Sequence, residues 1–483
     1  MRNYIKSIDI NALVLPTFTV VMSCVLGVII SNVSYPFLTL SAVLTTFAVI
    51  SFGWKLWWLC FPVFAFIGSN LNIGFKIYPE EIGFALSCAI LATLVFLKRV
   101  SVLRRNNTLN LTFLVLIIYI LMHMTVSLFA NPSGLLEGAG SIIRVYVGAL
   151  TWLIFSCLLY RYGSSHQLRF IFVVVFFVLM VRSAFSASQL FSLLNPLTTN
   201  TAFLVLPSLD ELRLSALLSI YIGIIVYYVS QSWFVKTAMS LYIVALVYLV
   251  MLGQGRVSTA SAIMLVALWI VLTKKIKIIV PIIAVAIIVI VVINVNKSML
   301  SSLPFAVQRA ISFVSIDDAL DAGVSKNTSS SDVWHKELLS MGLNKWASSL
   351  RNIVVGSVID PTDSNDFIRL PYSRMLEVAA NTARYENALG TILATLGLVG
   401  FCLYVKLFWL LLKEIVLVVI KNGIKDYKTA IYGVAFLSSL LFVIFIWIRG
   451  SFPGYELLFC VMAKMLYDDT KSASFNARSN AQC

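Results

Sequence analysis

Charged residues are scarce in this sequence. Asp, Glu, Lys and Arg make up 12% of its 483 residues, hydrophobic residues make up 60%, and the mean hydropathy is +0.94. A typical soluble domain has about 25% charged and about 45–50% apolar residues, so the composition excludes an ordinary soluble protein. Apolar runs of roughly 20 residues, each long enough to cross a bilayer core of about 30 Å, recur along the chain. The sequence therefore predicts an all-α, polytopic membrane protein.

The residues that metal and nucleophile chemistry need are also few. The three histidines, His123, His166 and His335, are too scattered for a zinc site. Six of the seven cysteines lie inside apolar runs and the seventh is Cys483, so no disulfide or metal framework is expected. Internal repeats, a phosphate-binding glycine loop and a nucleophile elbow are missing. The sequence predicts no metal and no cofactor.

A net charge of +15 could indicate nucleic acid, but the basic residues lie mainly in short loops between apolar runs, where membrane topology explains them better. We expect no nucleic-acid partner and 12–14 transmembrane helices. The candidate spans are residues 12–31, 36–52, 54–73, 80–97, 110–130, 139–160, 168–187, 213–230, 236–252, 257–273, 277–296, 388–412, 429–448 and 454–466.

The basic loops follow the fourth, sixth, tenth and twelfth spans, which puts them with both termini on one, cytoplasmic side. Residues 298–387 form the only long polar segment and carry more acidic than basic residues, so they are predicted to be extracytoplasmic. The predicted organisation is an N-terminal bundle (1–297), an outer loop (298–387), C-terminal helices (388–467) and a cytoplasmic tail (468–483).

The outer loop contains a predicted amphipathic helix. The stretch SDVWHKELLSMGLNKWASSL places Trp334, Leu338, Met341 and Trp346 at near-helical spacing. This helix either caps the bundle or contacts substrate.

Arginines lie at the predicted outer ends of separate helices, against the charge bias. Drawn together, they would line a cationic cavity that opens outward, and the planar guanidinium suits a diphosphate or carboxylate. The alternative for each is a structural pair with Glu137, Asp210, Glu211 or Glu456. The arginines are Arg144, Arg182, Arg213, Arg256, Arg384 and Arg449.

Glu386 and Asn387 end the outer loop in the stretch NTARYENALGTILATLGLVG. A carboxylate at a membrane edge is costly, which makes it a functional candidate. In a cationic cavity Glu386 could take a proton from an attacking hydroxyl, or it could be a salt-bridge partner of an arginine.

The spacing Glu386-Asn387, nine residues, Gly397, two residues, Gly400 resembles the signature of the O-antigen ligase and O-antigen polymerase superfamily of bacterial envelope glycosyltransferases. The segments LRLSALLSIYIG and LGQGRVSTASAIML resemble two further family segments in the same order. The resemblance implies metal-independent, inverting glycosyl transfer at the periplasmic face of the inner membrane, with a glycan on undecaprenyl diphosphate as donor.

In that scheme Arg213 and Arg256 hold the diphosphate and Glu386 is the general base. Arg384 and Arg449 line the same cavity without a motif match of their own, and Asn387 is a further substrate-binding residue. Ligases have a histidine where Glu386 stands, which favours a polymerase, and a chain-length regulator protein is then a conceivable partner. Asp317, Asp318 or Asp332 could serve instead as the base. The alternatives are a ligase that transfers the glycan to lipid A core and a transporter of lipid-linked sugars.

Overall fold

The computed structural model describes residues 57–67, 71–72, 76–100, 106–130, 139–193, 207–253, 255–274, 322–357, 385–445 and 452–482, with isolated positions at 291, 295, 307–309 and 312. These residues fall into two compact units that interleave in sequence. The first is drawn from Met1–Leu103 and Tyr162–Val250, and the second from Arg104–Arg161 and Met251–Cys483. The predicted spans 12–31, 36–52 and 277–296 lie outside the described residues, apart from single positions in the last.

The first unit packs its helices through small and polar side chains. Helix α9 lies along α10, and Ser183 and Ser215 hydrogen-bond between them in a buried position. Helix α4 lies along α5 at Gly83, where an added Cβ would come within 3.0 Å of the α4 backbone. The elements are α4 (Trp57–Ile67), β1 (Leu71–Asn72), β2 (Lys76–Ile77), α5 (Pro79–Phe96), η1 (Ser165–Gln167), α9 (Leu168–Leu193), α10 (Pro207–Val229) and α11 (Trp233–Leu252). The two strands pair antiparallel.

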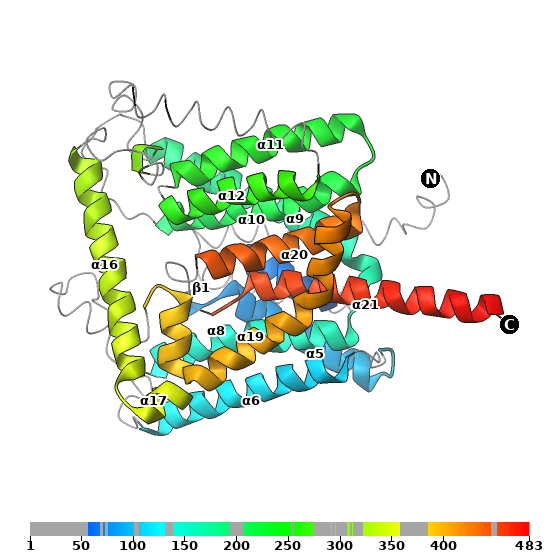
Figure 1. Cartoon of the computed structure of the whole chain (residues 1–483), viewed down its shortest axis with the longest axis horizontal. Helices are drawn as coiled ribbons and strands as arrows, with labels where there is room; N and C mark the ends of the chain where they lie inside the picture. The colour runs from blue at the N-terminus through cyan, green and yellow to red at the C-terminus, as the bar shows by residue number, and fades with distance from the viewer. Residues whose placement is uncertain are drawn as a thin grey trace. The chain divides into compact units, whose positions relative to one another are not determined.

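The second unit combines helices of the C-terminal half with two helices from the N-terminal half. Its elements are α6 (Asn107–Ala130), α8 (Ala139–Tyr162), α12 (Arg256–Leu272), α16 (Ala322–Ala347), α17 (Leu350–Val355), α19 (Ala388–Asn422), α20 (Tyr427–Ile444) and α21 (Tyr455–Gln482). Most of these helices run roughly alongside one another, whereas α16 runs across them (Figure 1). The predicted loop helix is therefore packed on the bundle rather than set apart as a domain of its own.

Six described helices are long and apolar enough to cross a membrane. Their outward faces carry large exposed apolar side chains, such as Leu114 and Met122 on α6, as contact with lipid requires. The fold is therefore an all-α, multi-pass membrane protein, as the composition predicts. The six are Pro79–Phe96, Asn107–Ala130, Val145–Tyr162, Leu212–Val229, Trp233–Leu252 and Tyr427–Ile444.

Helix α19 is broken at Gly397, whose φ of 63° and ψ of −167° are not helical. The backbone of residues 354–357 packs directly against the break, and Ser357 donates from both N and Oγ to the Ala394 carbonyl at 2.7 Å. On α6, Tyr119 Oη lies 2.9 Å from the Leu396 carbonyl oxygen and 3.1 Å from the Val355 carbonyl oxygen. The hydroxyl can therefore donate its hydrogen bond to either of them. A break in a helix frees backbone carbonyls, and here Ser357 and Tyr119 supply hydrogen-bond donors to those of Ala394 and Leu396.

Candidate functional site

Helix α16 carries the side chains of the candidate site and is seated on the start of α19. The predicted amphipathic helix is confirmed: Leu338 is fully buried, and Trp346 donates from Nε1 to the Ile353 carbonyl at 3.0 Å. The close contact between α16 and the start of α19 is at Gly342, where an added Cβ would come within 3.2 Å of the Tyr385 ring. On the same helix, Trp334 and His335 are partly exposed.

Glu386 is held next to these two side chains of α16. Trp334 donates from Nε1 to Glu386 Oε2 at 3.1 Å, and His335 Nδ1 lies 3.4 Å from the same oxygen. The backbone of Glu386 is left-handed, with a φ of 55°, between Tyr385 and Asn387, which are both 1% exposed. The Glu386 side chain itself is 49% exposed. A non-glycine residue in this conformation is uncommon, and such residues cluster at functional sites.

Asn387 is the N-cap of α19, and the chain itself uses both ends of its amide. Oδ1 accepts from Gly390 N, and Nδ2 donates to the Tyr385 carbonyl at 3.0 Å. An Asn at this position satisfies a helix N–H that would otherwise lack a partner. The predicted substrate-binding residue Asn387 thus fixes where α19 begins, directly after Glu386.

Arg256 is the first residue of α12, and it forms a two-point ion pair with Asp332 of α16. Its Nη1 donates to Oδ2 at 3.0 Å, and Nη2 contacts Oδ1. Burial lowers the pKa of Arg309, the nearby charge of Arg256 lowers it further, and Asp332 opposes both. The charge of Asp332 therefore acts on both Arg256 and Arg309.

The described arginines of the predicted set fall in both units. Arg256 belongs to the second unit with Glu386. In the first unit, Arg182 and Arg213 lie on α9 and α10 close to the Ser183–Ser215 hydrogen bond. Arg182 donates from Nη1 to the Phe66 carbonyl at 3.3 Å and interacts electrostatically with Glu80. Predicted positions outside the described residues are Arg384, Arg449, Asp317, Asp318 and the side chain of Arg144.

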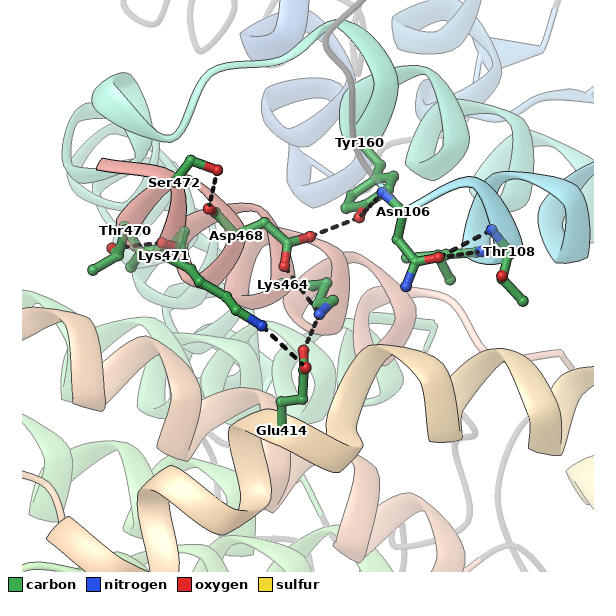
Figure 2. A network of polar contacts seen from close by, with 11 residues as sticks. Asn106, Thr108, Tyr160, Glu414, Lys464, Asp468, Thr470, Lys471 and Ser472 are labelled. Carbon is green, nitrogen blue, oxygen red and sulfur yellow. Dashed lines mark hydrogen bonds and ion pairs between the residues drawn. The ribbon is translucent and has the colours of Figure 1, made fainter. Parts of the chain in front are cut away.

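A second polar cluster, which sequence analysis did not single out, joins α8, α19 and α21 of the second unit to the residue that precedes α6 (Figure 2). Lys464 of α21, only 3% exposed, contacts Glu414 of α19 and lies 3.0 Å from Asp468. Asp468 accepts from Tyr160 Oη of α8 at 2.7 Å, and that oxygen lies 3.3 Å from Asn106 N at the start of α6. The sequence feature that indicates this cluster is Lys464, a charged residue inside the predicted span 454–466.

The cluster includes the start of α6 and the end of α8. Asn106 precedes α6 and Tyr160 lies near the end of α8, beside loops that the positive-inside rule assigns to one face, whereas Glu414 lies inside α19, before its C-terminal end at Asn422. Two further loops of that face also meet, since Lys274 donates from Nζ to the Lys421 carbonyl at 2.7 Å. Arg256 and Glu386 are at the opposite ends of α12 and α19.

We expect Lys464→Met to lower the free energy of unfolding by about 2–3 kcal/mol, because it leaves two carboxylates close together without their shared cation. The matched control is Lys471→Met: Lys471 lies 3.9 Å from Glu414 but is 68% exposed. An exposed pair of this kind contributes about 0–1 kcal/mol. Thermal unfolding in detergent micelles measures both variants, and equal shifts would contradict a structural role for the buried lysine.

Among the described residues, no group of three or more His, Cys, Asp or Glu side chains lies close enough together to hold a metal ion. No family model, curated protein or solved structure matches this chain. Its function therefore has to be inferred from the contacts of Glu386, Arg256 and α16.

Proposed function

We propose that this protein is a polymerase of a bacterial surface polysaccharide such as O-antigen. It would join undecaprenyl-diphosphate-linked repeat units at the periplasmic face of the inner membrane by inverting glycosyl transfer. The proposal draws on the resemblance of the Glu386–Gly400 segment to the O-antigen polymerase and ligase superfamily, and on the geometry of the site.

The observation that carries the proposal is the setting of Glu386. Its backbone is left-handed, two buried neighbours fix its position, and its carboxylate is half exposed. A folded chain keeps such strain where the surrounding structure enforces it. The carboxylate touches an indole N–H and an imidazole, which is a setting suited to proton transfer.

Helix α16 links this carboxylate to a cation. Asp332, which holds Arg256, precedes His335 by three residues, or about 4.5 Å along the axis. An anionic diphosphate can take the place of Asp332 on Arg256, because Asp332 is 59% exposed and returns to water at little cost. Arg256 would then neutralise the departing diphosphate, while the Glu386 site takes the proton of the attacking sugar hydroxyl.

The position of the charges supports transfer over transport. Arg256 is the first residue of its helix and Glu386 immediately precedes the N-cap of another, so both lie at helix ends. Transporters place their binding residues near the bilayer midplane. Tethering donor and acceptor to one membrane would supply much of the proximity that the reaction needs.

Reconstitution tests the proposal directly. The purified protein is placed in lipid vesicles with undecaprenyl-diphosphate-linked repeat units, and the products are separated by size. A polymerase extends the units into a ladder without another substrate. If no ladder forms, but glycan is transferred to lipid A core when that acceptor is added, the protein is a ligase. Movement of intact units across the bilayer would identify a transporter.

Arg256→Gln is expected to lower kcat/KM for chain extension about 10–100-fold, because a charge-assisted, two-point contact contributes about 1.5–3 kcal/mol. Folded yield should stay unchanged, since the abandoned Asp332 is mostly solvated. The control is Arg351→Gln, an exposed arginine on α17 of the same unit. If both variants retain full turnover, Arg256 has no part in diphosphate binding.

A further inference from the structure

Two nitrogen atoms from α16 converge on a single oxygen of Glu386. The indole N–H of Trp334 can only donate, so it occupies one lone pair of Oε2. His335 Nδ1 lies 3.4 Å from the same oxygen, and the imidazole is 33% exposed. Oε2 of Glu386 therefore already accepts one hydrogen bond, from Trp334, and also faces the imidazole of His335.

The position of the carboxylate also determines which imidazole nitrogen is available to accept a proton. A carboxylate beside Nδ1 favours the tautomer with its proton on Nδ1, which leaves the lone pair of Nε2 free to accept another. The carboxylate also stabilises the imidazolium that forms, in the manner of an acid–histidine pair in other enzymes. The left-handed backbone of Glu386 and the buried residues on either side hold the carboxylate in place for this task.

We propose that His335 is the catalytic base of the glycosyl transfer and that Glu386 is its positioning residue. This inference rests on the proposed function and adds to it the group that accepts the proton. It also gives the lone outer histidine a role that neither charge pattern nor motif spacing assigns to it.

The acceptor hydroxyl gives its proton to His335 Nε2 while its oxygen forms the bond to the anomeric carbon of the donor. The bond from that carbon to the diphosphate oxygen breaks, and the electron pair leaves with undecaprenyl diphosphate. The Nδ1 proton stays on the imidazolium, facing Glu386, and Nε2 later returns its proton to water.

Chemical rescue tests the assignment. His335→Ala is reconstituted in vesicles with lipid-linked repeat units, and chain extension is measured with and without added imidazole. We expect about a 100-fold loss of turnover, because positioned proton transfer contributes about 10²–10⁴-fold. Free imidazole should restore at least about a tenth of the wild-type rate, since His335 is partly exposed. His166→Ala, at an exposed histidine in η1, is the matched control and should respond to neither change.

The outcomes separate the two levels of the proposal. If His335→Ala extends chains within about threefold of the wild type, the inference fails, and Glu386 accepts the proton itself, as carboxylate bases do in other enzymes. Loss without imidazole rescue, in protein with wild-type thermal unfolding, would also overturn the inference. If the wild-type protein forms no polymer, the proposed function fails and this inference fails with it.

Discussion

Glu386→Gln is expected to reduce chain extension about 100-fold, as much as the loss of His335 through which it acts, at the lower end of the range that positioned proton transfer contributes. In cells that lack the native copy, lipopolysaccharide should then carry a single repeat unit on its core in place of a ladder. The reason is chemical rather than structural. The amide oxygen of Gln can still accept from Trp334, but it has no charge to stabilise a protonated His335 and is not a base.

Glu337→Gln is the matched control, because Glu337 lies two residues beyond His335 on α16. It should leave the ladder intact. An unchanged ladder in Glu386→Gln would show that Glu386 has no part in the reaction. An unsubstituted core with long glycan on undecaprenyl diphosphate would instead identify the protein as a ligase.

Glu386→Gly separates the backbone strain at this position from the function of its carboxylate. Glycine adopts a positive φ without the roughly 1–2 kcal/mol that an L-residue incurs there. The variant should therefore unfold at a higher temperature than the wild type while it fails to extend chains. A variant that loses both stability and activity would indicate that the contacts of Glu386 with Trp334 and His335 stabilise the fold.

The sequence predicts helices well where apolar length is the deciding feature. The predicted spans 110–130 and 139–160 correspond to α6 and α8, because about 20 apolar residues leave no other way to satisfy the backbone in lipid. The helix α21 continues far beyond the predicted end at residue 466. Its polar part begins where Lys464 and Asp468 pair one turn apart, which an apolar-run criterion does not register.

The candidate site was predictable only in its local part. Glu386 stands out because it adjoins an apolar run, and Arg256 because it opens one. Their partners, His335, Trp334 and Asp332, come from a helix distant in sequence, so no local pattern pairs them. No local pattern predicts the contact of Tyr119 with the Leu396 carbonyl either, because the two residues are 277 positions apart.

Gly397→Ala is expected to lower the free energy of unfolding by about 2–5 kcal/mol and to remove most folded protein from the membrane. The φ of 63° is unfavourable for alanine, and the new Cβ would lie 2.5 Å from Gly356 N and from the Val354 carbonyl oxygen. Neither backbone atom can rotate away as a flexible side chain would. Folded yield after detergent extraction and the thermal unfolding temperature measure the effect.

Gly148→Ala provides the control, because an added Cβ in α8 meets no atom within 4 Å. Alanine favours a helix over glycine by about 1 kcal/mol, so this variant should be at least as stable as the wild type. The contrast bears on function, because the break at Gly397 sets the direction of residues 388–396 and hence the position of Glu386 just before them. If Gly397→Ala were as stable as Gly148→Ala, α19 would be a continuous helix, and the contact of Glu386 with His335 would have to be formed in another way.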